Sequence, residues 1–353
     1  MSNPTASSAG PSQAEQQPKG PTPTQTRRMQ AGRLALGLGI LVFAAKLTAY
    51  FLTGSTAVLA DAMESTINIV SAGMLVFALS LAARPPDSSH PYGHGKVEFI
   101  SAGIEGAAVA FAAFVIIAEG VRELIEGPKL HDLDLGLALL AASAVVNGGL
   151  GVHLSRVGRE TDSPALIADG RHVLADVWTS IGVIAGLAVV AVTGWTWADP
   201  LIAIGVGIHV ALEALHLLGE AFGGLMDEAD EDLIAESAAR LESARDDSWI
   251  DLHEFRSWRS GARRHFDLHL MVPRFFDVTQ VHTIHDAIED VLLEDGDQGD
   301  VVVHFDPCEP HACLRCAMSD CAVRETPFER RPPFDRDRVT RRDFDARIDG
   351  AEH

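Results

Sequence analysis

The chain has 353 residues, 47% of them hydrophobic, and a formal net charge of −21 at pH 7. So acidic a chain is a poor partner for nucleic acid, and anionic lipid would repel it outside its short basic loops. Two explanations of the charge remain open: a generally acidic, salt-adapted proteome, and attraction of cations toward the soluble part of the chain.

The apolar residues are unevenly distributed along the chain. Nearly all long apolar runs precede about residue 222, and the chain after that point is charged. The sequence therefore predicts one part in lipid and one part in water. Residues 1–30 are rich in Pro, Gln, Ser and Thr and lack an apolar segment directly after a charged start. They are predicted to be a disordered cytoplasmic tail rather than a signal peptide.

Six apolar segments have the length of a membrane helix, since a bilayer core of about 30 Å takes about 20 residues. They are residues 33–53, 56–82, 98–120, 135–157, 164–193 and 197–219. Positive residues gather in the N-terminal tail, in the loop 83–97 and near 155–160, whereas the loops 53–56 and 193–197 have none. The positive-inside rule then predicts an all-α six-helix membrane domain over residues 31–222, with both termini in the cytoplasm.

Residues 223–307 have the pattern of a small soluble domain. A helix is predicted at 229–244, strands around 248–257 and 264–272, a helix at 278–294 and a strand over the VVVHF segment at 301–305. This order predicts a two-layer α+β fold. The Cys-rich residues 308–324 form an extension. Residues 325–353 are crowded with Arg and Asp and lack apolar periodicity, so they are predicted to be a disordered charged tail.

The second and fifth apolar segments begin alike, with STAVLAD at 55–61 and SPALIAD at 163–169. Polar residues continue at the same offsets in both: Asp61, Glu64 and Asn68 in one, and Asp169, His172 and Asp176 in the other. Such offsets share one face of a helix. Ionisable groups in a bilayer are costly and usually face a partner or a cavity. Either these stripes hold the helices together, or they form a ligand set, tetrahedral for Zn²⁺ or richer in oxygen for Mn²⁺ or Fe²⁺.

At this point the sequence resembles the cation diffusion facilitator family, over about residues 31–308. The motifs that carry the resemblance are Lys46 followed by Thr53-Gly54-Ser55, ADAMESTIN at 60–68, HPYGHGK at 90–96, ADGRHVLAD at 168–176, LMD at 225–227 and HFDP at 304–307. The resemblance implies a six-helix transmembrane domain followed by a metallochaperone-like cytoplasmic domain. It also implies a homodimer in the inner membrane that exchanges a cytoplasmic divalent cation for protons by alternating access.

The resemblance further implies four ligands in the membrane. They are Glu64, Asn68, His172 and Asp176, with Asp61 and Asp169 as supporting polar residues. Glu64 and Asn68 depart from the usual residues at their positions, and an Asn oxygen is a harder ligand, which shifts the expectation from Zn²⁺ toward Mn²⁺ or Fe²⁺. Zn²⁺ remains first because family members are often zinc exporters. Protons compete with metal for such ligands, and His172 is predicted to carry much of the exchanged proton load.

Two further metal sites and an ion pair follow from the resemblance. The loop after the second segment offers Asp87, His90 and His94, unless these are merely solvated turn residues. The soluble domain offers a binuclear zinc site at the dimer interface, unless ordinary packing explains its histidines; its residues are His253, His269, His282, His304 and Asp306. Lys96 is expected to pair with Asp227 at the join between the two domains.

All four cysteines lie in the extension after the soluble domain. They are Cys308, Cys313, Cys316 and Cys321, with His311 among them. Such clustering favours a reduced compartment and metal ligation over a disulfide framework. The gap between Cys313 and Cys316 is common in zinc knuckles. An iron–sulfur cluster and free thiols remain as alternatives.

Two rival functions are left open by the sequence. A membrane-anchored metal sensor or scaffold would follow if Asn68 weakens the membrane site. A redox membrane protein would follow if the cysteines carry electrons. No nucleophile–base arrangement stands out, so a transporter is expected rather than an enzyme.

Overall fold

The computed structural model describes residues 22–53, 56–127, 134–195, 197–293 and 299–342. The chain divides into two compact units. The first comprises Met1–Pro85 and Ser101–Leu217, and the second comprises Pro86–Ile100 and Leu218–His353. The loop between α2 and α3 therefore belongs to the same unit as the C-terminal part of the chain.

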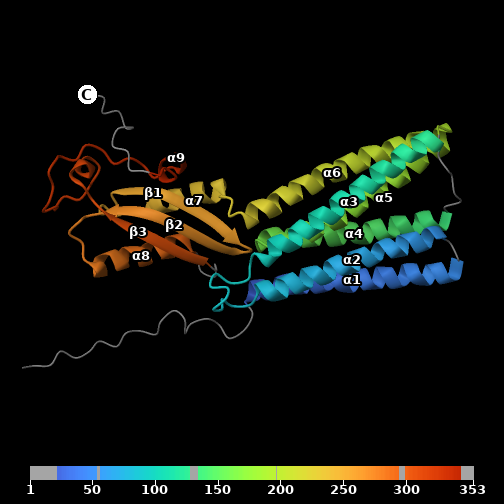
Figure 1. The fold of residues 1–353 in the computed structure, drawn as a ribbon, viewed down its shortest axis with the longest axis horizontal. Helices are drawn as coiled ribbons and strands as arrows, with labels where there is room; N and C mark the ends of the chain where they lie inside the picture. The colour runs from blue at the N-terminus through green and yellow to red at the C-terminus, as the bar shows by residue number, and fades with distance from the viewer. Residues whose placement is uncertain (1–21, 54–55, 128–133, 196, 294–298, 343–353) are drawn as a thin grey trace, which may run out of the picture. The chain divides into compact units, whose positions relative to one another are not determined.

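Long helices make up the first unit (Figure 1). They are α1 (Pro23–Thr53), α2 (Thr56–Ala82), α3 (Val97–Glu126), α4 (Asp134–Glu160), α5 (Pro164–Thr193) and α6 (Ala198–Leu225), the last residues of α6 and the first of α3 lying in the second unit. Within the described residues, three stretches are long and apolar enough to cross a membrane: Pro23–Ala45, Val97–Glu126 and Pro200–Leu225. Helix α2 adds a shorter apolar stretch at Asn68–Ala82.

Helix α1 begins earlier than predicted, at Pro23 instead of residue 33. Thr22 and Gln25 form a reciprocal cap, in which Gln25 N donates to Thr22 Oγ1 at 3.2 Å and Thr22 N donates to Gln25 Oε1 at 3.0 Å. Pro23 suits the first helical position because its missing N–H would have no helical partner. The expectation of a disordered tail is therefore wrong for residues 23–30.

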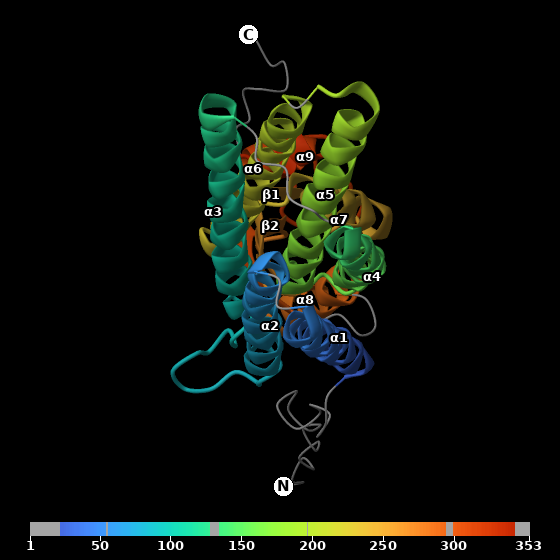
Figure 2. The same ribbon diagram turned by 90° about the vertical axis from the view of Figure 1, so that its right-hand side faces the viewer.

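Among the described residues, helix α5 takes part in two apolar clusters of the first unit. One cluster joins α1, α2, α4 and α5, with Leu75, Leu154 and Leu166 fully buried. The other joins α3, α5 and α6 through Val109, Ala175 and other small residues. The helices run beside one another in Figure 2. This arrangement gives α5 neighbours among the other helices on more than one side.

The outer faces of these helices are apolar. Large hydrophobic side chains are exposed on α2, α3, α4, α5 and α6, among them Phe77, Phe111, Phe114, Val145, Val192 and Leu215. A water-soluble protein rarely exposes so many large apolar side chains. Lipid is the medium that suits this surface, because helices satisfy their own backbone groups there.

The second unit contains a three-stranded sheet with the order β1-β2-β3. Its elements are α7 (Glu231–Ala244), β1 (Asp251–Ser260), β2 (Arg263–Val272), α8 (Val278–Leu292) and β3 (Gly299–Pro307), in the predicted chain order. Strands β1 and β2 are antiparallel, and β2 and β3 are parallel. Asp230 caps α7, and Asp277 with Gln280 forms a capping box at the start of α8.

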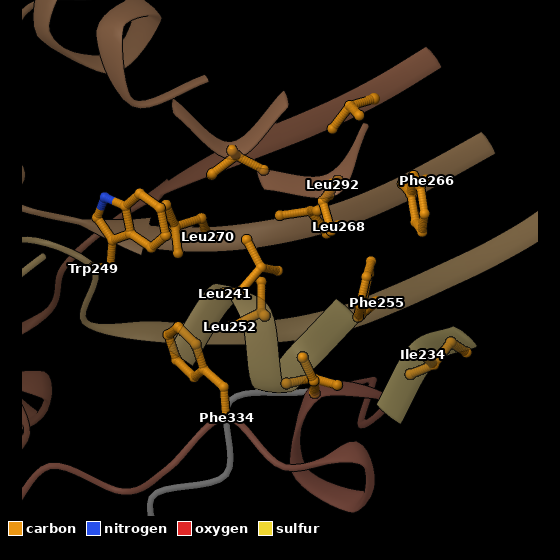
Figure 3. Packing of buried hydrophobic residues seen from close by; sticks show 14 of the residues in the cluster. Ile234, Leu241, Trp249, Leu252, Phe255, Phe266, Leu268, Leu270, Leu292 and Phe334 are labelled. Atoms are coloured by element: carbon orange, nitrogen blue, oxygen red, sulfur yellow. The ribbon is translucent and has the colours of Figure 1, made fainter. Parts of the chain in front are cut away.

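One face of the sheet packs against the helices. Leu252 and Phe255 of β1 and Leu268 of β2 belong to one buried cluster with Ile234 and Leu241 of α7 (Figure 3). Because side chains alternate along a strand, every second residue faces the other way. The histidines of the sheet therefore lie on the face opposite this core.

The C-terminal segment is ordered further than predicted. Phe334 and Val339, on either side of the start of helix α9 (Arg336–Val339), are buried in the core of the second unit. Arg245 lies over the Phe334 ring at 3.7 Å. The expectation of disorder from residue 325 is thus wrong for this segment. Two isolated apolar residues among many charged ones form no periodic pattern, so the sequence does not predict that this segment is ordered. The core that they complete is made of residues far away in sequence.

Candidate metal sites

Three of the four predicted membrane ligands meet between α2 and α5. Asn68 Nδ2 donates to Asp176 Oδ2 at 2.9 Å. His172 Nε2 lies 4.0 Å from Asp176 Oδ1, as expected for residues four apart on one helix. His172 is nearly fully buried and Asp176 about one quarter exposed. An amide, an imidazole and a carboxylate therefore share one small space inside the first unit.

The side chains of two predicted membrane residues lie outside the described residues. Glu64 and Asp61 belong to α2, in the part of that helix whose side chains lie outside the described residues. Their membership of the site stays a prediction.

Asp169 is buried on α5, three residues before His172. Together with Asn68 and Asn147 it lines a cavity of about 30 Å³ among α1, α2, α4 and α5. Among the described residues, Asp169 Oδ2 has no hydrogen-bond partner. A space of this size accommodates a water molecule, which would satisfy that oxygen. A supporting role for Asp169 stays a prediction.

Sequence analysis missed Glu105, in the middle of α3. Its Oε1 lies 2.5 Å from His172 Nδ1, and both side chains are nearly fully buried. The signal was present, since Glu105 is an acidic residue inside an apolar run. It was overlooked because α3 lies outside the repeat that singled out α2 and α5.

The loop residues Asp87, His90 and His94 come together as predicted from the sequence. One ligand atom from each lies within 4.8 Å of the others, and His94 Nε2 is 3.4 Å from Asp87 Oδ2. Ser89 Oγ and the backbone N–H groups of His90 and Ser89 all donate to Asp87 Oδ1. These donors hold the pKa of the Asp87 carboxyl well below its usual range, with Ser89 the main cause. The loop thus presents an ionised carboxylate and two imidazoles to one point.

The same loop docks on the tip of the β1–β2 hairpin. A Cβ at Gly95 would collide with the backbone carbonyl of Ser260. The Tyr92 ring meets the buried His265 ring edge-on, with centroids 5.7 Å apart. Both contacts lie within the second unit. The loop site and the sheet are therefore parts of one compact body.

Lys96 and Asp227 form the predicted ion pair. Lys96 Nζ lies 2.9 Å from Asp227 Oδ1 and 3.0 Å from Oδ2. Both residues belong to the second unit, so the pair lies within that unit and does not bridge the two.

The sheet brings together four of the five predicted cytoplasmic ligands. Strand register places His253 opposite His269, and His269 opposite His304. Asp306 joins them: its Oδ2 lies 3.0 Å from His269 Nδ1 and 3.4 Å from His253 Nε2, and its Oδ1 lies 3.5 Å from His304 Nε2. Burial lowers the pKa of His253, so this imidazole favours the neutral form that binds metal.

His282 lies elsewhere, on an exposed part of α8. It groups with His285 and Asp286, whose ligand atoms lie within 4.8 Å of one another. Its Nδ1 is 3.8 Å from Asp286 Oδ1. The predicted five-residue set is therefore divided within this chain, and His285 belongs to the second group.

The cysteines lie in a compact loop after β3. All four are free thiols, with Cys313 and Cys316 buried. Burial raises the pKa of Cys316, whereas for Cys313 the opposing effect of burial is outweighed by backbone donors at Glu325 and Thr326, which lower its pKa. Within the described chain, the groups of three ligand atoms that lie close together include no cysteine.

His311 lies in the same loop. Its Nδ1 is 3.4 Å from Glu309 Oε2, on an exposed part of the short helix that starts at Pro310. Metal binding by the four cysteines and His311 stays a prediction.

Comparison with known proteins covers both units. Residues 33–226 match a cation efflux transmembrane domain, and residues 229–308 match the cytoplasmic domain of cation efflux proteins. The uncharacterized transporter sll1263 of Synechocystis sp. is 38% identical over 276 residues, which are 78% of this chain and 89% of that protein. The cation-efflux pump FieF of Escherichia fergusonii is 28% identical over 282 residues, 79% of this chain and 92% of the pump. Cys313, Cys316 and Cys321 lie beyond both matched ranges.

Proposed function

Because this chain belongs to the cation efflux family of membrane transporters, we propose that it exports a divalent metal ion from the cytoplasm through the site between α2 and α5. The meeting of Asn68, His172 and Asp176 inside a lipid-facing helical unit carries this proposal. Polar and ionisable groups are retained at such depth where they serve transport. Glu64 is proposed as the fourth ligand.

Zn²⁺ is the proposed first choice of ion, with Mn²⁺ and Fe²⁺ next. One imidazole and two carboxylates suit Zn²⁺, while the amide oxygen of Asn68 adds a harder ligand that suits Mn²⁺ or Fe²⁺. With Glu64 and Asp176 ionised, the site would neutralise the charge of a divalent ion.

Protons are the proposed counter-substrate. Metal needs a neutral imidazole and ionised carboxylates, so a proton on His172 and a metal ion at the site exclude each other. Alternating access of the site to the two sides of the membrane would then exchange a metal ion from one side for protons from the other.

The proposed assembly is a homodimer in the inner membrane. Six helices would cross the bilayer between residues 31 and 222, and both termini and the soluble domain, residues 223–307, would lie in the cytoplasm. The loop site and the sheet site would both face that compartment. Metal bound at these sites would stabilise the folded dimer. The stability of the dimer would then depend on the concentration of metal in the cytoplasm.

The test is uptake into proteoliposomes of Zn²⁺, Mn²⁺, Fe²⁺, Co²⁺ and Cd²⁺ in the presence of a pH gradient. Wild type is compared with His172→Ala, which should abolish uptake, and with Asn68→Asp, which should raise the preference for Zn²⁺. Uptake of all five ions by His172→Ala at the wild-type rate would contradict the proposal.

A second candidate function is a metal sensor or scaffold without flux. It is favoured by the hydrogen bond from Asn68 to Asp176, which occupies one carboxylate oxygen at the proposed transport site. In this case metal would drive dimerisation of the reconstituted protein while uptake of every ion stays at the level of empty vesicles.

A further inference from the structure

Glu105 brings a third helix to the proposed transport site. Its carboxylate comes from α3, and its Oε1 lies 2.5 Å from His172 Nδ1. Glu105 is 5% exposed and His172 is 7% exposed, so solvent reaches neither group freely. Nearby on α3 the buried residues are small or apolar, including Ala102 and Val109. A carboxylate in such surroundings is costly unless a polar partner compensates it, and His172 is the partner within reach.

The contact selects one of the two nitrogens of His172. Nδ1 is turned to Glu105, whereas Nε2 is the nitrogen nearer Asp176, at 4.0 Å. A metal-binding imidazole uses one nitrogen for the ion and donates the N–H of the other, most often to a carboxylate or a carbonyl. Around His172, Asp176 lies on one side of the ring and Glu105 on the other, where Oε1 and Nδ1 are in close contact without the alignment of a hydrogen bond, and neither atom has a hydrogen-bond partner among the described residues.

We propose that Glu105 is a positioning residue that accepts a hydrogen bond from His172 Nδ1 and so holds Nε2 toward the metal. This inference rests on the proposed transport function and deepens it. Glu105 does not contact the ion, because an ion shared by Nε2 and Asp176 lies across the ring from Nδ1. The contact fixes both the tautomer and the orientation of the ring.

The test separates the hydrogen-bond acceptor from the charge. Glu105→Gln keeps an acceptor oxygen at the same length, and Glu105→Met keeps the length without a good acceptor. Zn²⁺ uptake by the full chain in proteoliposomes is measured as a function of Zn²⁺ concentration. Glu105→Met should raise KM about 10-fold or more, the usual effect of losing such a partner, and Glu105→Gln should stay within about 3-fold of wild type.

The control is Glu119 on the same helix. Its side chain is about half exposed and pairs with Arg122 at 2.5 Å. Glu119→Gln and Glu119→Met should leave KM unchanged. Where Glu105→Met does not give folded protein, Glu105→Leu takes its place, and size-exclusion profiles identify the folded variants.

The Glu105 variants test the positioning role, and the His172 variant tests the transport site. A Glu105→Gln variant as impaired as Glu105→Met would show that the charge matters and would overturn the positioning role, as would wild-type KM in both. Wild-type uptake by His172→Ala alone would instead refute the transport site itself.

Discussion

Arg338 and Asp251 form a buried ion pair between α9 and the start of β1. Arg338 Nη2 lies 2.7 Å and Nε 3.1 Å from the same oxygen of Asp251, and the two residues are 8% and 3% exposed. The other oxygen of Asp251 is 3.7 Å from His253 Nδ1. A segment beyond the matched cytoplasmic domain thus lies against a carboxylate that adjoins the sheet site.

Removing one partner of this pair should destabilise the second unit. Arg338→Met would leave the Asp251 carboxylate buried without its cation, which costs about 3–5 kcal/mol. Hydrogen exchange should accelerate in β1 and in residues 334–341 of the full chain. Arg336→Met is the matched control, because Arg336 forms an exposed pair with Glu231 worth at most about 1 kcal/mol. Equal exchange in the two variants would contradict a stabilising role for the buried pair.

Gly95 is expected to tolerate no side chain. Gly95→Ala would push the loop off the hairpin, because the added Cβ meets the backbone of Ser260 and cannot rotate away. Overpacking of this kind costs about 1–3 kcal/mol or more. Hydrogen exchange in residues 90–96 and 256–263 should rise together. Gly219→Ala on α6 is the control, since nothing lies within 4 Å of its added Cβ and Ala favours a helix.

His253 should make the sheet sensitive to acid. Its pKa is lowered by burial from the ordinary value of 6.5, so the folded protein binds this proton less readily than the unfolded chain. The contribution of His253 to stability is therefore complete above pH 6.5 and is lost as the pH falls through its lowered pKa. In chelator-treated protein, His253→Gln should flatten the pH dependence of hydrogen exchange in β1 and β2 below pH 6.5.

The matched control for that measurement is His282→Gln on α8. Its side chain is 74% exposed, so it lacks the burial that shifts His253. It should keep the wild-type pH dependence. If His253→Gln leaves the pH dependence of hydrogen exchange in β1 and β2 unchanged, protonation of His253 does not determine the acid sensitivity of the sheet.

Local patterns were enough to predict the strands of the sheet. The β2 segment alternates in polarity from His265 to Leu270, and this alternation puts His269 on the face away from the core. Asp87, His90 and His94 are close in sequence, so a turn suffices to gather them. The repeat in α2 and α5 likewise brought Asn68 and Asp176 into the hypothesis.

Long-range packing could not be predicted in this way. Glu105 joins His172 only because α3 and α5 pack together, and no periodicity within α3 reveals that contact. Phe334 and Val339 are isolated apolar residues in the sequence, and in the structure they complete a core built by α7 and the sheet. The place of Lys96 and Asp227 in a single unit also depends on how the loop docks, which the sequence does not encode locally.

The Lys96–Asp227 pair should matter more for transport than for stability. Its side chains are 41% and 45% exposed, and an exposed pair contributes at most about 1 kcal/mol. Lys96→Met should therefore leave the melting temperature of the detergent-solubilised chain nearly unchanged. If the pair holds the end of α6 against the start of α3, the same variant should lower the maximal rate of Zn²⁺ uptake. Exchanging the charges, with Lys96→Asp and Asp227→Lys together, should recover uptake that each single change loses, and a double variant as slow as the singles would rule out the ion pair as the cause.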